Sequence, residues 1–524
     1  RTDSSCQACG QISVADGEWP FLQVFDFTQG DFEIKLEQPG ADEIVVLDHN
    51  NADLDDYAGI TLDRNSASQE SEIQISLVDQ QLNIDPTDED VVIFKVAGYT
   101  KGLTANNGTA NVVFTNGTIN ADWLKTDVDE GTHQWNTTSL GHGFDENGYF
   151  VMNNNTAGAT QHVFDKQATD DDTVTYDAPG FTFLVFFEDA DNTGTFSNVD
   201  DADKSSLIVN ATAKRGTSAT FSYVNDAQSF IVSNDFGTID LVDSSVGDEW
   251  NSGETLAVIL VDQDLNKNTL SDEDMSLKSH NTTIPSLQIG SPITLTSASE
   301  IGNANMTVGT FNKIATISVA DVTDIGTGIT INYTATTVGD YRAQHDAADY
   351  VFLNYNVTSV VSSITGVILQ DRAMNVVLPS VSTTETSGLL QLTTTINAVG
   401  ASGLDGTILS ETDALRLNFS GDGAIDAQVG DVLFADIFTF GDVAGQDRAN
   451  NAIYRFLLEE SGDNTGTFIG DVEYVMLNQI NSDTSTTFSD ITTISDEIDI
   501  IVHEDLTDED SPRLNYLDLG ADGV

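Results

Sequence analysis

Residues Ser76–Val96 read SLVDQQLNIDPTDEDVVIFKV, and residues Ile259–Ser279 read ILVDQDLNKNTLSDEDMSLKS. Each copy begins with an apolar, β-branched segment and continues into a loop crowded with Asp and Asn, which is the pattern of a strand followed by a turn. A shortened third copy, IIVHEDLTDED, begins at Ile500. Internal repeats of this kind predict a chain built from successive similar units.

A second repeat is a strand that ends in a glycine turn. It reads FFEDADNTGTFSNV from Phe186 and LLEESGDNTGTFIGDV from Leu457. Both copies keep the glycine of NTGTF, which predicts a positive φ in a tight turn. The two repeats alternate along the chain as loop, turn, loop, turn, loop. We therefore expect units that begin at the acidic loop and close at the NTGTF turn, with an extra sandwich in the longer second interval.

Period-two alternation of apolar and polar residues recurs along the whole chain and predicts half-buried strands. The segment 449–460 also fits a helix, although residues 453–458 within it fit a strand equally well. The clearest alternating or densely apolar strand segments are Phe32–Glu37, Ile73–Leu77, Phe181–Phe187, Ile329–Tyr333 and Leu415–Phe419. Many short strands with polar turns predict an all-β fold of tandem immunoglobulin-like antiparallel β-sandwich domains.

The repeats also suggest where these units lie. We expect an N-terminal β segment or partial sandwich, three stretches of immunoglobulin-like sandwich, and the start of a further unit. Their predicted limits are residues 1–70, 71–216 with the first acidic loop, 217–348 with the second acidic loop, 349–495 closing with the NTGTF turn, and 496–524. The chain begins at Arg1, so we expect a processed form or a piece of a longer array.

The chain carries 84 acidic and 19 basic residues, a formal net charge of −65, while 39% of its residues are apolar. The apolar share is enough to build cores, so a disordered acidic tail is excluded. Nucleic acid and anionic membrane surfaces are disfavoured because both require clustered Lys and Arg. No apolar run reaches the length of a membrane-spanning helix. The expected partners are cations, and the expected surroundings are salty, because salt screens self-repulsion.

The acidic loops carry oxygen ligands at spacings close to those of an EF-hand calcium loop. The second loop departs from that pattern at Lys267, which stands where the sharp-turn glycine belongs, and its flanks are strands rather than helices. Its candidate ligands are Asp262, Asp264, Asn266, Asn268 and Glu273. The first loop offers Asp79, Asn83, Asp85 and Asp90, with Gln81 at the third position. A third set, around the first NTGTF turn, is Asp189, Asp191, Thr193 and Asp200.

Two interpretations of these loops stay open. Crowded carboxylates repel one another, so a structural calcium or other divalent cation would fix each loop. Alternatively, Asp and Asn form good turns by bonding their own backbone, and clusters arise by chance in so acidic a chain. In the second NTGTF copy Ser461 replaces Asp189, so metal binding is not a shared property of that turn.

The cysteines and sequons bear on an extracellular location. Cys6 and Cys9 form a lone CxxC, which we interpret as a local disulfide or an inert pair, because zinc needs about four ligands. Ten N-x-[ST] sequons are candidate glycosylation sites if the chain is exported, although Asn, Ser and Thr are common enough to produce many by chance. These are Asn107, Asn116, Asn136, Asn154, Asn210, Asn281, Asn305, Asn332, Asn356 and Asn418.

No catalytic motif stands out, so we predict that the chain is not an enzyme and name no catalytic residue. It has no G-x-S-x-G, H-E-x-x-H or phosphate-binding glycine loop. The segment 141–146 (GHGFDE) has His, Asp and Glu together but reads more simply as a loop. Trp123 and Trp135 are candidates for stacking on a sugar or for core packing.

Three segments, VDQDLNKNTLSDED, EESGDNTGTFIGDVEY and IIVHEDLTDEDSPRLNYLDLGADGV, resemble the S-layer proteins of ammonia-oxidising archaea. The resemblance extends from about residue 70 to the end and covers structural rather than catalytic motifs. It implies a secreted, glycosylated protein of immunoglobulin-like domains that self-assembles into a porous two-dimensional lattice on the cell surface, often with divalent cations bound.

The charge suggests what such a lattice would do. Pores lined with carboxylates concentrate cations, including ammonium, and exclude anions. Two alternatives remain at this point: a secreted immunoglobulin-like adhesin or carbohydrate-binding protein, and a secreted hydrolase with a localised cleft of perturbed carboxylates.

Overall fold

The structure is a computed structural model of the 524-residue chain. The residues it describes fall into long segments and isolated strands. The long segments are 32–47, 56–83, 89–96, 182–247, 249–276, 284–290, 292–298, 350–359, 431–440, 451–480, 491–502 and 513–518. The shorter pieces are 11–13, 21–23, 111–113, 150–153, 163–166, 304–308, 315–317, 328–332, 366–371, 387–393 and 414–420.

The fold is all-β, which confirms the predicted class. Apart from short 3₁₀ turns such as η4 (Asp243–Ser245) and η6 (Leu477–Gln479), the regular elements of the described residues are strands. The segment that fits either a helix or a strand forms strands β29 (Ala452–Phe456) and β30 (Glu459–Glu460). No helix in the described part of the chain is long and apolar enough to cross a membrane.

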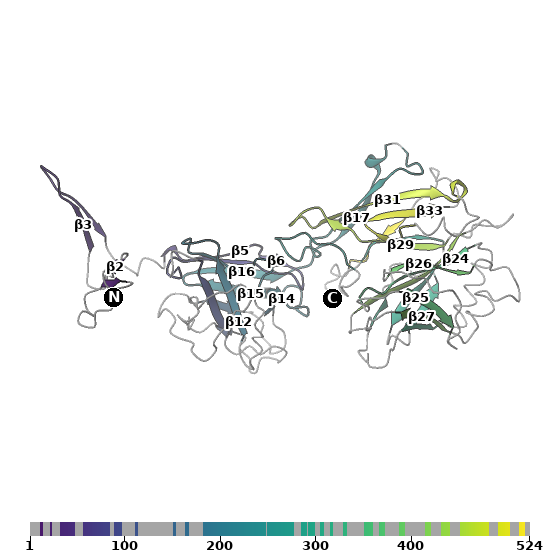
Figure 1. Cartoon of the computed structure of the whole chain (residues 1–524), viewed down its shortest axis with the longest axis horizontal. Coiled ribbons are helices and arrows are strands. Elements are labelled where there is room, and N and C mark those ends of the chain that lie inside the picture. The colour runs from purple at the N-terminus through teal and green to yellow at the C-terminus, as the bar shows by residue number, and fades with distance from the viewer. Residues whose placement is uncertain are drawn as a thin grey trace.

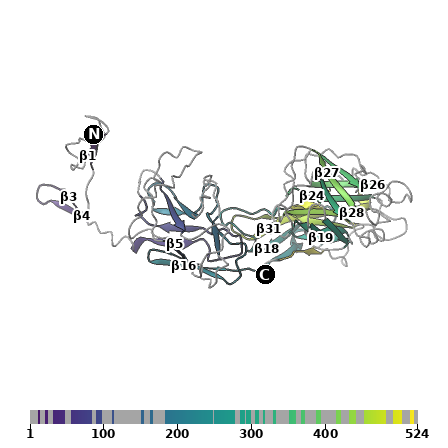
Figure 2. The same cartoon turned by 90° about the horizontal axis from the view of Figure 1, so that it is seen from below.

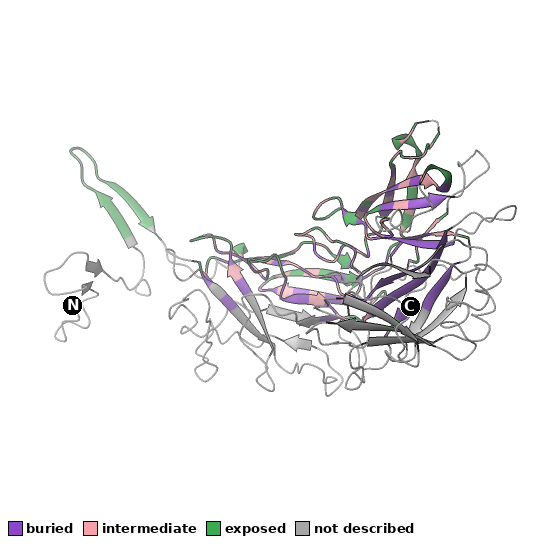
Figure 3. Ribbon diagram, turned by 45° about the vertical axis from the view of Figure 1, so that its right-hand side comes forward, coloured by how far each residue is buried: buried purple, intermediate pink, exposed green. Residues whose placement is uncertain are grey.

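The N-terminal strands form small ribbons apart from the larger sheets. β1 (Gln11–Ser13) pairs with β2 (Phe21–Gln23), and β3 (Phe32–Leu36) pairs with β4 (Glu43–Leu47), both antiparallel. The β3–β4 hairpin is exposed along its length, as the green ribbon in Figure 3 shows. Figure 1 shows this hairpin at one end of the long axis, followed by two larger groups of sheets.

The first unit consists of two five-stranded sheets around one core. One sheet has the order β5-β7-β13-β12-β8 and the other the order β6-β16-β15-β10-β9, with β11 and β14 as an added pair. The bounds are β5 (Gly59–Leu62), β6 (Ser66–Ala67), β7 (Ile75–Val78), β8 (Val91–Val96), β9 (Asn111–Val113), β10 (Phe150–Asn153), β11 (Phe164–Lys166), β12 (Thr182–Glu188), β13 (Thr195–Ser197), β14 (Leu207–Val209), β15 (Ser218–Tyr223) and β16 (Asp226–Val232).

Apolar side chains at alternate positions of the strands form the core between the two sheets of the first unit. In β15 every second side chain, Ala219, Phe221 and Tyr223, is buried, as period two requires. Phe164 packs against the rings of Phe221 and Phe230, with 5.0 Å between centroids in each pair. The resulting core extends from residue 60 to residue 232, so the predicted limits 71 and 216 lie inside this unit.

The second unit brings together strands from distant parts of the chain. One sheet has the order β17-β18-β31-β30, with β33 pairing β31, and another has the order β32-β29-β19-β34. The bounds not yet given are β17 (Thr238–Val242), β18 (Leu256–Val261), β19 (Ser286–Ile289), β31 (Thr467–Met476), β32 (Ile494–Ser495), β33 (Glu497–Val502) and β34 (Leu514–Asn515). Their shared core runs from Leu256 to Val502.

A nine-stranded sheet lies between these strands in sequence and beside them in space (Figures 1 and 2). Its order is β25-β27-β23-β21-β20-β28-β24-β26, with β22 pairing β28. The bounds are β20 (Ile293–Ala298), β21 (Ala304–Val308), β22 (Ala315–Thr316), β23 (Gly328–Asn332), β24 (Tyr350–Asn356), β25 (Gly366–Asp371), β26 (Ser387–Thr393), β27 (Ala414–Ser420) and β28 (Val432–Phe440).

A buried ion pair lies where the nine-stranded sheet meets the second unit, beside an apolar contact in which the rings of Phe438 and Tyr454 are 5.4 Å apart between centroids. All nine residues of β28 and all five of β29 are buried, so each strand is covered on both faces. Arg455 of β29 donates from Nη2 to Asp436 Oδ1 of β28 at 3.1 Å and from Nε to Oδ2 at 3.3 Å. Its guanidinium carbon also lies 4.2 Å from the centre of the Phe434 ring. These contacts compensate a charge that would otherwise be costly to bury.

We expect Arg455→Met to destabilise the second unit by about 3–5 kcal/mol, because it leaves the Asp436 carboxylate buried without its cation. Urea unfolding followed by tryptophan fluorescence measures this, since Trp250 packs on Tyr474 within the same core at 4.8 Å between centroids. The double variant Arg455→Met with Asp436→Leu should regain much of the loss. A single variant as stable as the parent would contradict the interpretation.

Candidate functional site: the acidic loops and the NTGTF turns

The acidic loop and the NTGTF turn, which lie far apart in sequence, meet in space in both units. β7 pairs with β13 in the first unit, and β18 pairs with β31 in the second. At the end of each pairing the loop's first Asp donates its backbone N–H to the turn glycine: Asp79 to Gly194 O and Asp262 to Gly466 O, both at 2.8 Å. Loop and turn are therefore two halves of one element, which we call the loop–turn element.

A glutamate that sequence reasoning missed ties the two halves together. Oε1 of Glu188 accepts the N–H groups of Thr193 and Gly194 at 2.8 and 2.7 Å, and its Oε2 accepts the N–H of Asp90 at 3.0 Å. In the second unit Glu460 does the same with Thr465, Gly466 and Glu273, at 2.8, 2.6 and 3.2 Å. Aligning the two NTGTF segments places these glutamates at the same position. The sequence repeat could therefore have identified them as residues shared by the two turns.

The turn glycines confirm the predicted backbone conformation. Gly194 has φ +63° and Gly466 has φ +56°, which is the left-handed region that favours glycine. A Cβ at either position would also collide with a glutamine side chain from the loop, Gln80 or Gln263. Those glutamines donate to the carbonyls of Thr193 and Thr465, at 2.5 and 2.7 Å.

An amide pair completes each element. Asn83 Nδ2 donates to Asn192 Oδ1, and Asn266 Nδ2 donates to Asn464 Oδ1, both at 2.8 Å. A tyrosine from elsewhere in the fold also closes each loop: Tyr223 OH donates to Asp79 Oδ2 at 2.5 Å, and Tyr516 OH donates to Asp262 Oδ2 at 2.6 Å. The two elements thus share a hydrogen-bond pattern, and not only a sequence.

Several predicted metal ligands accept hydrogen bonds from the protein itself. Asp262 Oδ1 accepts the N–H of Asp264 at 2.9 Å, and Asp79 Oδ1 accepts the N–H of Gln81 at 2.8 Å, which are the side chain to backbone bonds typical of Asp in turns. Asp264 accepts from Asp235 N at 3.0 Å and from Asn234 Nδ2 at 3.1 Å. In the described part of the chain no three His, Cys, Asp or Glu side chains converge as a metal cluster.

The third predicted ligand set is divided by a strand. Asp189 and Asp191 are exposed, whereas Asp200 is buried and accepts the N–H groups of Ala202 and Lys204 at 3.0 and 2.9 Å. Strand β13 lies between them and separates the two ends by about 10 Å, at ~3.3 Å per residue. Asp85 of the first loop lies outside the described residues. The calcium assignments of these sets stay predictions.

Two carboxyl groups of the second loop–turn element have raised pKa values. Burial, and then the facing carboxyl of Glu460, raises the pKa of Glu273 to about 8. Burial raises the pKa of Asp262 to about 6, against the lowering effect of the Tyr516 hydroxyl. Both groups are therefore held where negative charge is unfavourable.

The second acidic loop also docks onto the first unit. Arg64 donates from Nη1 to Asn266 O at 2.9 Å and from Nη2 to Lys267 O at 2.6 Å and Glu72 O at 2.7 Å. Lys267 Nζ donates to Ser68 Oγ and Gln69 O, both at 2.8 Å. Burial lowers the pKa of Lys267 to about 8, partly offset by Asp264. Lys267, which departs from the EF-hand pattern, therefore belongs to the contact between the two units.

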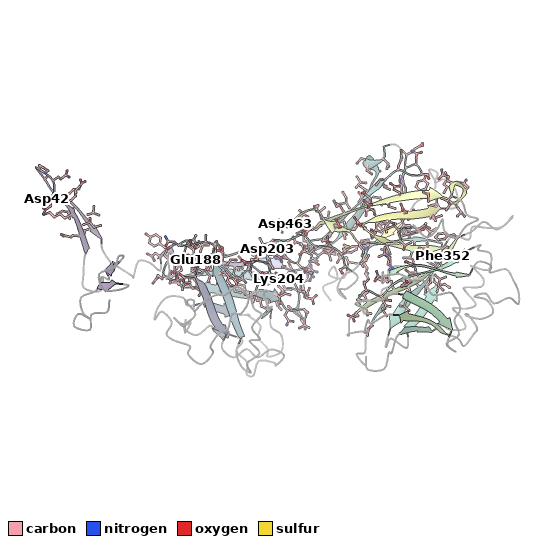
Figure 4. The ribbon with its side chains drawn as sticks, viewed as in Figure 1. Asp42, Glu188, Asp203, Lys204, Phe352 and Asp463 are labelled. Atoms are coloured by element: carbon pink, nitrogen blue, oxygen red, sulfur yellow. The ribbon has the colours of Figure 1, made fainter. Side chains whose placement is uncertain are left out.

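Further bonds fix the orientation of the docked loop. Glu72 N donates to Lys267 O at 2.7 Å, and Asn268 Nδ2 donates to Asp203 O at 2.7 Å. Thr269 Oγ1 donates to Asp63 Oδ2 at 2.9 Å. Figure 4 labels Asp203 and Lys204 on the first unit's side of this junction and Asp463 of the second turn on the other.

The candidate glycosylation sites differ in environment. Asn356 is only 7% exposed, and its Oδ1 accepts from the N–H and hydroxyl of Thr358, so the described fold hides it from a glycan. Asn210 is half-buried and bonds Thr212 in the same way. Asn305, Asn332 and Asn418 lie on strands β21, β23 and β27.

Other predicted features fall on residues that the structure does not describe. These are Cys6, Cys9, the sequons Asn107, Asn116, Asn136, Asn154 and Asn281, the pair Trp123 and Trp135, and the segment 141–146.

Comparisons with known proteins assign no family. No protein-family model matches the chain, and no curated protein matches it. Among solved structures, a chain titled BspA_C_mut is 9% identical, covering 79% of this chain and 97% of that chain, with a TM-score of 0.12. A likeness this weak supports no statement about fold or function.

We expect Arg64→Met to loosen the junction between the units, because it removes the donors to three backbone carbonyls. Small-angle X-ray scattering should then show a broader distribution of intramolecular distances, and thermal unfolding a loss of about 1–3 kcal/mol. The matched control is Arg215→Met, since Arg215 is exposed. Scattering curves that coincide for both variants and the parent would contradict the proposed role.

Proposed function

We propose that this chain is a structural protein of an extracellular surface layer, built from tandem immunoglobulin-like units that assemble into a porous, acidic lattice. The observation that carries the proposal is the repeated loop–turn element, together with the docking of the second element onto the first unit through Arg64 and Lys267. Units that share a pattern and are locked at their junction suit a load-bearing array.

The charge distribution supports the same proposal. Three of the 19 basic residues, Arg64, Lys267 and Arg455, are engaged in internal contacts. Some carboxyl groups are buried as well, but with 84 acidic residues against 19 basic ones the surface stays strongly acidic. A lattice of such surfaces would surround its pores with a negative potential that enriches cations and excludes anions.

We expect this negative potential to attract cations. Ammonium is the cation of metabolic interest for the ammonia-oxidising archaea whose S-layer proteins the sequence resembles. Such a lattice would need neither a catalytic residue nor a membrane-spanning segment in this chain. Export would make the solvent-facing sequons available for glycosylation.

Sheet formation tests the lattice. Negative-stain electron microscopy of the purified chain over a range of protein and calcium concentrations should show two-dimensional arrays above a threshold concentration. A protein that stays monomeric at all concentrations and retains a glycan ligand on a glycan array would instead be an adhesin, and the proposal would fail.

Ion partitioning tests the sieve. Assembled sheets equilibrated at low ionic strength should take up ammonium in excess over nitrate, and 0.5 M sodium chloride should abolish the difference, because salt at about this concentration shortens the Debye length to a few Å. Equal uptake of ammonium and nitrate at low salt would refute the sieving role while leaving assembly untouched.

A further inference from the structure

The β3–β4 hairpin is a two-stranded ribbon that no other layer covers in the described part of the chain. Its side chains from Glu33 to Val46 are all exposed, and no further described strand pairs with either of its edges (Figure 3). A hairpin of two strands is marginally stable at best in water, and a third strand adds independent stability. The ribbon is therefore an incomplete sheet with two free edges among the described strands.

One face of this ribbon is apolar. Ile34 of β3 lies opposite Val45 of β4, and Leu36 shares their face because side chains alternate along a strand. Ile34, Val45 and Leu36 are 54%, 53% and 62% exposed. Exposed apolar side chains that lie next to one another mark interaction sites.

The charges on the other face of β3 fit a second copy of the same strand. In an antiparallel pairing of two β3 strands with Ile34 opposite Ile34, Glu33 of each copy lies opposite Lys35 of the other. Opposite charges in such cross-strand pairs are stabilising, whereas like charges are destabilising. Lys35 is the only Lys or Arg between Arg1 and Arg64. The β3 edge is thus complementary to itself in a chain whose acidic surfaces otherwise repel one another.

The β4 edge lacks this complementarity. The same antiparallel pairing of two β4 strands about Val45 places Glu43 opposite Leu47 and Ile44 opposite Val46, so no ion pair forms. A lysine on an edge strand ordinarily discourages pairing with another strand. In β3 the glutamate two residues before the lysine reverses that effect, because it compensates the lysine of the second copy.

The contacts within the hairpin leave Lys35 able to take this further partner. Its Nζ lies 2.7 Å from Asp42 Oδ2 and 3.4 Å from Glu37 Oε1. The side chain is still 42% exposed, and an ammonium group has three donors. Lys35 can therefore bind a carboxylate of a second copy and keep its contacts with its own hairpin.

We propose that two copies of this chain join through their β3 strands into one four-stranded antiparallel sheet with the strand order β4-β3-β3-β4. A two-fold axis passes beside Ile34, and one Glu33–Lys35 ion pair lies on each side of it. Val45 and Ile34 of both copies then form one row across the four strands, in which neighbouring apolar side chains pack on one another. A contact with this symmetry is closed, so it produces dimers.

Sedimentation velocity of the full-length chain over a range of concentrations tests the proposal, in about 0.15 M sodium chloride to screen the repulsion between the rest of the two copies. Glu33→Lys and Lys35→Glu each place like charges opposite one another on both sides of the axis. We expect each variant alone to dimerise about tenfold more weakly than the parent. An equimolar mixture of the two variants should dimerise as the parent does, because every charge then meets its opposite.

The matched control is Lys214→Glu, which makes the same change of charge at an exposed position of the first unit and should dimerise as the parent does. A monomeric parent, a dimer that neither single variant weakens, or a mixture no stronger than its components would each overturn the proposal. Recovery in the mixture requires intact hairpins in both variants, so it separates lost pairing from misfolding. The proposal does not rest on the surface-layer function, since dimerisation is measured at concentrations below those that give sheets.

Discussion

Self-repulsion is the constraint on which the rest of this structure depends. A chain with 84 acidic and 19 basic residues can bring two acidic units together only where positive charge or hydrogen-bond donors are placed between them. The contact between the units meets this requirement through Arg64 and Lys267, whose donors are directed mainly to backbone carbonyls. The contact between the nine-stranded sheet and the second unit meets it through Arg455 and Asp436. Three of the scarce basic residues are thus placed at these interfaces.

The loop–turn element explains how one local motif serves both stability and assembly of units. Inside each unit, Glu188 or Glu460 ties the loop to the turn by accepting backbone N–H groups from both. Outside the second unit, the same loop presents Lys267 and the carbonyl of Asn266 to the neighbour. The element therefore contributes both to the stability of its own unit and to the contact with the neighbouring unit.

The strand content was predictable from local pattern, and the arrangement of the strands was not. Alternation in Ile329–Tyr333 and Leu415–Phe419 correctly located β23 and β27, because the two faces of a strand lie in different environments. It could not show that β31 pairs with β18, about two hundred residues upstream. It also gave no sign that β28 is covered on both faces, since that depends on what packs against it.

For the candidate site, the sequence by itself determined the repeats, the positive φ of Gly194 and Gly466, and the gathering of carboxylates in short loops. These are local properties of backbone conformation and composition. Only the tertiary structure decided that Asp262 and Asp264 bond protein groups, that Glu460 and Asn464 complete the element, and that Lys267 belongs to the contact between units. The physical reason is that hydrogen-bond partners are set by the segments that lie beside a loop. In this fold those segments come from positions far away in the chain.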